Sequence, residues 1–275
     1  MKKRILFACD LEGMNNVVGE AYSGLSKSSE QWEIARRQAA LEINAAAEAL
    51  FEAGVISISL WDNHGGGGNI DPPDLDKRIE LLAVDNSQPR MSFAKGRFDA
   101  ICYFGYHAME GTLGGVLAHT MNSKNNQYYK LNGRYIGEVD MDAYIAAEYE
   151  IPSVFFVGGD IACRQARRAV TQIVTVITKE ELGRNKANFR ENNELFAEIK
   201  AKIIEAVNTD FAPERLKLPS IMEKSYKRTE DAAKYLMRMR DAGISADHPD
   251  DDILGKDAHT VVSRINSIDE FIISI

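Results

Sequence analysis

Cysteine is scarce in this chain, and the few cysteines have no paired spacing. The three thiols belong to Cys9, Cys102 and Cys163, and two of them lie in apolar, strand-like runs where a buried thiol is usual. This pattern argues against a disulfide framework and against a metal site built from thiolates. We therefore expect a reducing compartment, the cytoplasm.

Long hydrophobic runs are missing as well. The basic start, residues 1–4, looks like the first part of a secretion signal, but the apolar run behind it stops at Asp10 and is too short for a signal core. No other run approaches the roughly 20 apolar residues of a membrane-spanning helix. We expect neither a leader peptide nor a membrane partner.

Positive charge is in deficit, with 33 lysines and arginines against 41 aspartates and glutamates and a formal net charge of −8. Because phosphate contacts need clustered basic side chains, this balance argues against a nucleic-acid partner. Hydrophobic residues at 45% and charged residues at 27% are ordinary for a folded chain. Metal cations fit this composition better than polyanions do.

Four short apolar runs, partly β-branched and without clean alternation, have the pattern of strands buried on both faces. They are residues 4–9, 55–60, 100–104 and 153–157. Between the first two, residues 29–53 repeat apolar side chains at helical spacing, and Gly54 provides a stop signal. Strands that alternate with helices predict an α/β fold of three layers, α/β/α, with a mainly parallel sheet.

The later part of the chain departs from this pattern. Asn132-Gly133 lies between two strand-like arms and predicts an antiparallel hairpin, before a helix at 138–150. Beyond about residue 180 the sequence is more charged, with a long polar helix expected at 184–208 and a strand at 270–275. We expect a larger α/β domain at 1–180 and a smaller C-terminal α/β lobe at 181–275.

Polar side chains directly follow the first three predicted strands. Asp10 and Glu12 follow the first strand, Asp62 and His64 follow the second, and His107 follows the third. Because the carboxyl ends of parallel strands share one edge of a doubly wound sheet, these residues should meet in one crevice. Asp62 is either a turn residue or an outer acceptor that orients a ligand imidazole.

Glu138, at the start of the next predicted helix, completes a set of three carboxylates and two imidazoles. Zinc and manganese take ligands of these types, and five of them exceed the needs of one catalytic zinc with an open position. We therefore predict two divalent ions per chain, Zn²⁺ or Mn²⁺, in the 1–180 domain. Such a site makes water a nucleophile at neutral pH, which indicates a hydrolase.

The same residues allow other interpretations. A strand-end aspartate is often a turn or cap residue, and a lone histidine is often a hydrogen-bonded core residue. A non-catalytic metal-binding or scaffold protein would use the same ligands. A metal-dependent phosphohydrolase would also place Asp10 here, but residues 10–13 lack the second aspartate of an aspartyl nucleophile site. The glycines at 65–68 lack the lysine and hydroxyl of a nucleotide-binding P-loop.

An ordered series of short motifs carries a family resemblance. It consists of Asp10-Leu11-Glu12-Gly13, Asp62-Asn63-His64, Gly105-Tyr106-His107-Ala108, His119, Asn132-Gly133-Arg134, Gly137-Glu138 and Val157-Gly158-Gly159-Asp160. Over roughly its first 160 residues the chain resembles the zinc D-aminopeptidases of the dipeptide-transport-protein family. Two features depart from the family pattern: Ala8-Cys9 stands where Ser-Val is usual, and the glycines at 65–68 give that loop unusual freedom.

The resemblance implies a binuclear zinc site, removal of N-terminal D-amino acids from short peptides, and assembly into a ring-based homodecamer. It implies that the zinc ligands are Asp10, Glu12, His64, His107 and Glu138. His119 matches the histidine proposed for catalysis, as nucleophile, acid or base, or stabilising group. We therefore expect a metal-dependent aminopeptidase that hydrolyses the N-terminal peptide bond of short peptides.

Overall fold

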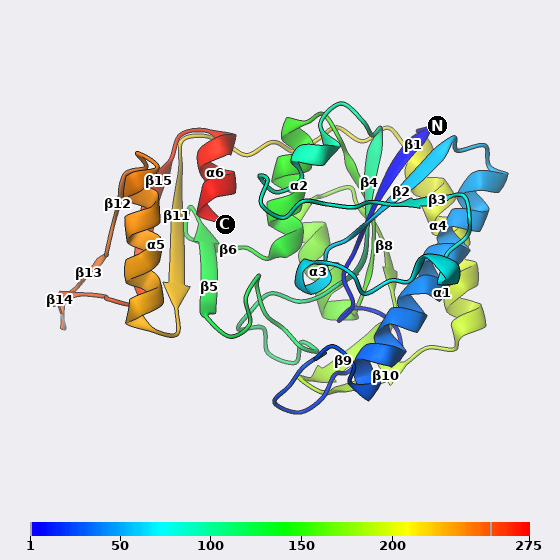
Figure 1. Ribbon diagram of the computed structural model, residues 1–275, viewed down its shortest axis with the longest axis horizontal. Helices are drawn as coiled ribbons and strands as arrows, with labels where there is room; N and C mark the ends of the chain where they lie inside the picture. The colour runs from blue at the N-terminus through cyan, green and yellow to red at the C-terminus, as the bar shows by residue number, and fades with distance from the viewer. Residues whose placement is uncertain (1, 254) are drawn as a thin grey trace.

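The computed structural model describes residues 2–253 and 255–275, which form a larger and a smaller lobe (Figure 1). A six-stranded parallel sheet, in the order β3-β2-β1-β4-β7-β8, is the centre of the larger lobe. Its strands are β1 Arg4–Cys9, β2 Ser57–Asp62, β3 Ile79–Leu81, β4 Ala100–Tyr106, β7 Ser153–Gly158 and β8 Val174–Ile177. The predicted parallel sheet is confirmed, and its four predicted strands are placed within two residues at either end.

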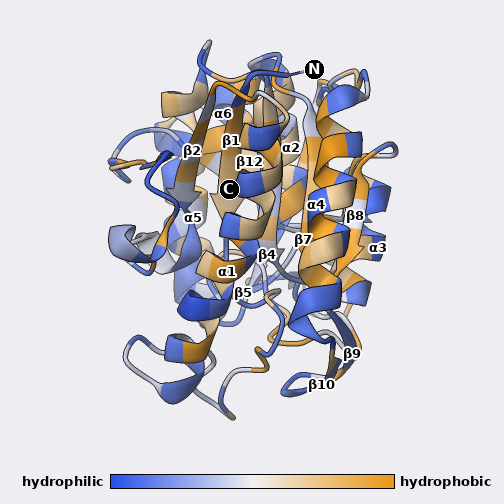
Figure 2. Cartoon of the chain, turned by 90° about the vertical axis from the view of Figure 1, so that its right-hand side faces the viewer, coloured by the Kyte–Doolittle hydropathy of each residue, from blue (hydrophilic) through white to orange (hydrophobic). Residues whose placement is uncertain are grey.

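Helices cover both faces of this sheet, which gives the three predicted layers. α1 (Glu30–Glu52) and α4 (Asn192–Asn208) pack on one face, and α2 (Glu138–Glu148) and α3 (Asp160–Ala169) pack on the other. Figure 2 shows the strands as mainly hydrophobic ribbons between helices that mix hydrophilic and hydrophobic residues. In the part of the chain that the structure describes, no helix is long and apolar enough to cross a membrane.

The smaller lobe is an antiparallel sheet in the order β12-β15-β11-β5-β6, packed with α5 and α6. Its elements are β5 Asn126–Leu131, β6 Arg134–Tyr135, β11 Ser220–Tyr226, α5 Thr229–Asp241, β12 Ala246–Asp247, β15 Thr260–Ile265 and α6 Ile268–Ser274. The predicted Asn-Gly hairpin is therefore present as β5–β6, and it pairs with β11 rather than with the parallel sheet. A division of the chain at residue 180 stays a prediction, since each lobe contains elements from both sides of that point.

A continuous hydrophobic core joins the two lobes. Successive side chains of β1 point to opposite faces, so that Phe7 packs toward α1 and Leu6 packs toward α2. The core on the α2 side also contains Met222 and Phe271 of the smaller lobe. The two lobes are thus packed together through buried apolar side chains.

One predicted helix has the wrong start, and one predicted strand is wrong in type. The helix expected at 184–208 begins only at Asn192, because Lys186–Phe189 forms strand β10, which pairs with β9 (Lys179–Gly183). The strand expected at 270–275 is helix α6, which the Ser267 side chain caps by accepting a hydrogen bond from the Glu270 amide at 3.1 Å. The β-branched run favoured a strand, but the cap and the burial of Phe271 favour a helix. A third short hairpin, β13 (Asp250–Asp251) with β14 (Gly255–Lys256), precedes β15.

Candidate metal centre

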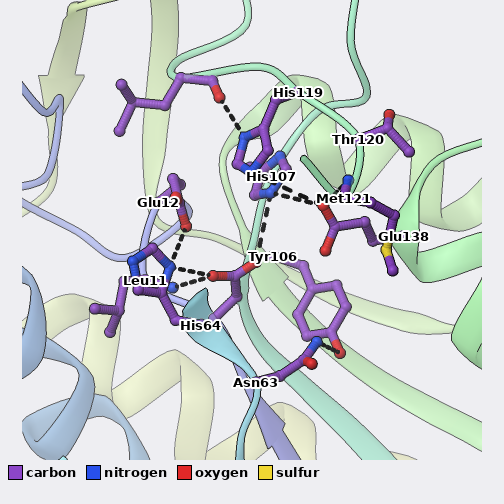
Figure 3. Close-up of polar contacts among 12 residues, drawn as sticks. Leu11, Glu12, Asn63, His64, Tyr106, His107, His119, Thr120, Met121 and Glu138 are labelled. Atoms are coloured by element: carbon purple, nitrogen blue, oxygen red, sulfur yellow. Dashed lines mark hydrogen bonds and ion pairs between the residues drawn. The ribbon is translucent and has the colours of Figure 1, made fainter. Parts of the chain in front are cut away.

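The predicted site residues lie where three adjacent strands end. Asp10 follows β1, His64 begins the short 3-10 turn after β2, and His107 follows β4. β1 lies between β2 and β4, which is a topological switch point of the sheet, where ligands bind in α/β folds. Glu138, the first residue of α2, faces the same point, and Figure 3 shows its carboxylate directed toward His107.

Two glycines allow the loops after β1 and β4 to come into close contact. The amide of Gly13 donates to the carbonyl of Gly105 at 2.7 Å. A Cβ on Gly13 would lie 2.1 Å from the Tyr106 carbonyl oxygen, and Gly105 has a φ of +69° that side chains rarely adopt. The approach of these two loops brings Asp10 and His107 face to face.

Asp10 lies between two imidazoles. Its Oδ1 is 2.8 Å from Nδ1 of His64, and its Oδ2 is 3.4 Å from Nε2 of His107. His64 Nδ1 is also 3.1 Å from Oε2 of Glu12. Asp10 and Glu12 are 4% and 5% exposed, so this cluster of charge is almost removed from solvent. Each oxygen of the Asp10 carboxylate thus faces a different imidazole.

Glu138 connects the cluster to His119. Its Oε1 lies 3.5 Å from Nε2 of His107 and 3.9 Å from Nε2 of His119, and it accepts a hydrogen bond from the Met121 amide at 2.7 Å. The rings of the two histidines are stacked, with centroids 3.9 Å apart and planes 13° from parallel. Nδ1 of His119 is 2.9 Å from the Leu117 carbonyl, which orients the ring so that Nε2 faces the cavity. The structure thus brings all six predicted residues together.

The donor set fits divalent metal ions. Two groups of ligand atoms, each within 4.8 Å, share His107: one contains Asp10 and Glu12, and the other contains His119 and Glu138. Nδ1 of His107 lies 3.0 Å from its neighbouring carbonyl, whereas its buried Nε2 has no hydrogen-bond partner among the described residues and faces two carboxylates. An imidazole fixed at one nitrogen and open at the other is typical of metal ligands.

The electrostatics of the cluster favour positive charge. Burial opposes charge on Asp10, His64 and His107, but their oppositely charged neighbours together have the larger effect on the pKa. Glu12 and Asp10 raise the pKa of His64 to about 11, and Asp10 and Glu138 also raise the pKa of His107. The nearby imidazoles of His107 and His64 hold the pKa of Asp10 well below its usual range. The field that retains protons on these imidazoles would also attract divalent cations.

Comparisons with known proteins agree with this geometry. A family model described as D-aminopeptidase matches residues 3–241. The chain belongs to the D-aminopeptidase family. The resemblance inferred from the motifs is therefore confirmed, and the scaffold and phosphohydrolase alternatives are not favoured.

The sequence and structure comparisons of this family member each match a D-aminopeptidase from Bacillus subtilis. The D-aminopeptidase of strain 168 is 24% identical over 185 residues, which cover 66% of this chain and 65% of the relative, slightly less than two thirds of its length. The zinc-dependent D-aminopeptidase DppA, a self-compartmentalizing protease, has the same fold. The comparison of this chain with DppA gives a TM-score of 0.84 at 19% sequence identity and covers 98% of this chain and 94% of DppA.

In this D-aminopeptidase family member, a buried lysine that the sequence patterns did not indicate supports the loop of Glu12. Nζ of Lys179 donates to the carbonyl oxygens of Glu12, Met14 and Val17 at 2.5, 2.9 and 2.5 Å. Lys179 is fully buried, and burial lowers its pKa to about 8. Its three acceptors fix the path of the chain on both sides of Met14.

The same hairpin, β9–β10, supports the loop of His119. The Val116 amide donates to Oε1 of the buried Glu181 at 2.7 Å. The Leu117 amide donates to the Arg184 carbonyl at 2.9 Å, and Nη1 of Arg184 donates to the Ala118 carbonyl at 3.2 Å. One hairpin therefore holds the loops of Glu12 and His119.

The hydrogen bonds of Asp62 favour its role as a turn residue. Its Oδ2 accepts from the Asn69 amide at 2.6 Å, and its Oδ1 accepts from Asn69 Nδ2 at 2.9 Å. The same Nδ2 also donates to the His64 carbonyl at 2.7 Å. Asp62 thus closes the glycine-rich loop and acts on the backbone of His64 rather than on its imidazole.

Proposed function

We propose that this chain is a zinc-dependent aminopeptidase that removes a D-amino acid from the N-terminus of a short peptide. One observation carries this proposal: three carboxylates and two imidazoles converge at the switch point, beside His119, in a member of a D-aminopeptidase family. The zinc dependence of DppA, which has the same fold, supports zinc over manganese. The five ligands support two ions per chain.

Asp10, Glu12, His64, His107 and Glu138 would hold the metal ions. When bound, zinc supplies a Lewis acid for the scissile carbonyl and lowers the pKa of water enough for attack at neutral pH. The Met121 amide fixes the carboxylate of Glu138, and the Leu117 carbonyl fixes the ring of His119. We assign to Nε2 of His119 the holding or transfer of a proton at the scissile bond.

The cavity above the ligands has the size of a site for a small peptide. Its volume is about 750 Å³, within the usual range for small-molecule sites, and Asp10, His64, His119 and Glu138 all line it. A substrate bound here would place its first peptide bond against the ligand cluster. This supports cleavage of short peptides.

We also propose a homo-oligomer, specifically a ring-based decamer, in the cytoplasm. The self-compartmentalizing assembly of DppA supports the oligomer. The three cysteines are all free and buried, which is consistent with a reducing compartment. Sedimentation of the purified protein should give ten times the chain mass, and a monomer would contradict the assembly.

A matched panel of dipeptides with D- and L-residues at the first position tests the activity. The zinc-loaded protein should cleave the D-substrates preferentially, and a chelator should abolish turnover. A preference for L-substrates would contradict the chirality. A zinc-loaded, folded protein without turnover would instead indicate the non-catalytic metal-binding alternative.

A further inference from the structure

Basic side chains line the cavity outside the ligand cluster. Arg90, Lys124 and Arg184 belong to its wall. Among the described residues that line it, Asp62 is the only carboxylate beyond the ligand set, and both its oxygens accept hydrogen bonds from Asn69. With divalent ions balancing the ligand carboxylates, the remaining wall is positive, which favours a negatively charged part of the substrate.

Arg90 is the cation that the surrounding structure fixes in place. Its Nε and Nη2 donate to the two oxygens of Asp142 at 2.6 and 2.8 Å, and Asp142 is fully buried. The hydroxyl of Tyr106 donates to the same carboxylate at 2.7 Å. The guanidinium also lies over the ring of Trp61, 4.9 Å from its centroid. An arginine held in this way loses little conformational entropy when it binds a ligand.

One nitrogen of this guanidinium remains available. Nη1 of Arg90 makes no hydrogen bond to any residue that the structure describes, and it does not belong to the buried polar atoms that lack a partner. The Arg90 side chain is 17% exposed, and Arg90 lines the cavity. Nη1 can therefore donate to a ligand from a fixed position.

Arg90 is held near the start of α2 through its partner Asp142. Its partner Asp142 follows Glu138 by one helical turn, so that the two lie about 6 Å apart along the axis. One extended peptide residue spans about 3.5 Å. Arg90 and Glu138 line the same cavity, so a short peptide whose first bond lies at the ligand cluster can direct its C-terminus to Arg90 within that cavity.

We propose that Arg90 binds the free C-terminal carboxylate of the substrate, which makes short peptides with an unblocked C-terminus the substrate class. This inference rests on the proposed peptidase function. The bond is a charge-assisted hydrogen bond from Nη1 of Arg90 to the carboxylate. Lys124, which is exposed at the edge of the cavity, has no such fixed geometry.

The test compares the dipeptides of the panel that begin with a D-residue with their C-terminal amides. The zinc-loaded protein should have a higher kcat/KM for the free acid, and Arg90→Lys should reduce this preference about 10- to 100-fold, the loss expected for one charge-assisted hydrogen bond. Because both rates come from the same sample, a general folding or metal defect cancels in the ratio. Lys124→Gln is the matched control and should leave the ratio unchanged.

Equal rates for acid and amide in the wild type, or an unchanged ratio in Arg90→Lys, would overturn the proposal. If Arg90→Lys fails to fold, the double variant Arg90→Met with Asp142→Asn removes both buried charges and should lose the same preference. If neither compound is cleaved, the proposed function fails. Calorimetric binding then decides the inference separately: tighter binding of the acid, lost on substitution of Arg90, supports it, and equal binding contradicts it.

Discussion

At the scale of residues, Asp10 and Asp62 are two strand-end aspartates with different surroundings. Asp10 faces two imidazoles, whereas Asp62 binds the loop backbone through Asn69. Asp10→Ala should therefore weaken zinc binding more than Asp62→Ala, for which a loss of about 10- to 100-fold is expected. Competition with a chromogenic chelator measures both affinities. Equal losses would mean that Asp10 does not contribute more to zinc binding than Asp62 does.

We propose that His119 acts on the substrate, in preference to a role as metal ligand with His107 and Glu138, whose ligand atoms lie within 4.8 Å of its own. Its Nε2 is 3.9 Å from Glu138, farther than the corresponding distance for His107. His119→Ala should retain both metal ions and its fold while losing about 10²- to 10⁴-fold in turnover, the range of a positioned acid or base. Elemental analysis and circular dichroism on the assayed sample provide the control. Loss of metal would make His119 a ligand, and unchanged turnover would make it a packing residue.

Glu42 makes the free energy of unfolding depend on pH. Its Oε1 accepts from the Asn15 amide, its Oε2 has no partner among the described residues, and burial raises its pKa from 4.5 to about 7. The folded protein therefore favours the protonated form of Glu42. The resulting contribution to the free energy of unfolding is complete below pH 4.5 and is lost as pH rises through 7.

Glu42→Gln should remove this pH dependence. Between pH 4.5 and 8 the free energy of unfolding of the wild type should fall by up to about 3 kcal/mol relative to that of the variant. This amount is the free-energy equivalent of the pKa shift. Urea unfolding at several pH values measures the difference. Glu52→Gln, at an exposed position of α1, the helix that also contains Glu42, is the control. Parallel pH curves for Glu42→Gln and the wild type would contradict the prediction.

At the scale of elements, the sequence predicted secondary structure best where the pattern lies within a single segment of the chain. The apolar runs of β1, β2, β4 and β7 and the polar residues behind them lie within single segments, so that their meeting follows from parallel topology alone. Hairpin β9–β10 could not be found in this way, because its role depends on contacts of Lys179 and Glu181 with distant loops. For α6 a local signal existed, since Ser267 and Glu270 have the spacing of a helix cap.

The support that β9 gives to the Glu12 loop can be measured. Lys179→Met should lower the free energy of unfolding by about 2–4 kcal/mol, because it leaves three buried carbonyls without a donor. It should also weaken zinc binding, since Glu12 loses its fixed backbone. Lys186→Met, at an exposed position of β10, is the matched control. Unchanged zinc affinity in a folded Lys179→Met variant would show that the Glu12 loop keeps its path without the lysine.

At the scale of the whole molecule, the ligand cluster should link metal binding to global stability. Its carboxylates and imidazoles lie on loops after three strands and on α2, so that bound zinc would tie these segments together. Zinc at 100 times its dissociation constant should stabilise the protein by about 2.7 kcal/mol per site, and a chelator should lower Tm. Differential scanning calorimetry with elemental analysis measures this and should give up to two ions per chain. A Tm that does not respond to zinc would contradict the linkage.

The pairing of β5 with β11 has a consequence for biosynthesis. A ribosome releases β5 and β6 well before β11, the strand that covers the other edge of β5. Until β11 emerges, the nascent chain carries an uncovered strand edge, the kind of surface on which other chains add. A fragment that stops after the parallel sheet would keep this edge permanently. Truncation ahead of β11 should therefore yield aggregates rather than a shorter working enzyme, and translation must reach the last quarter of the message before the hairpin is protected.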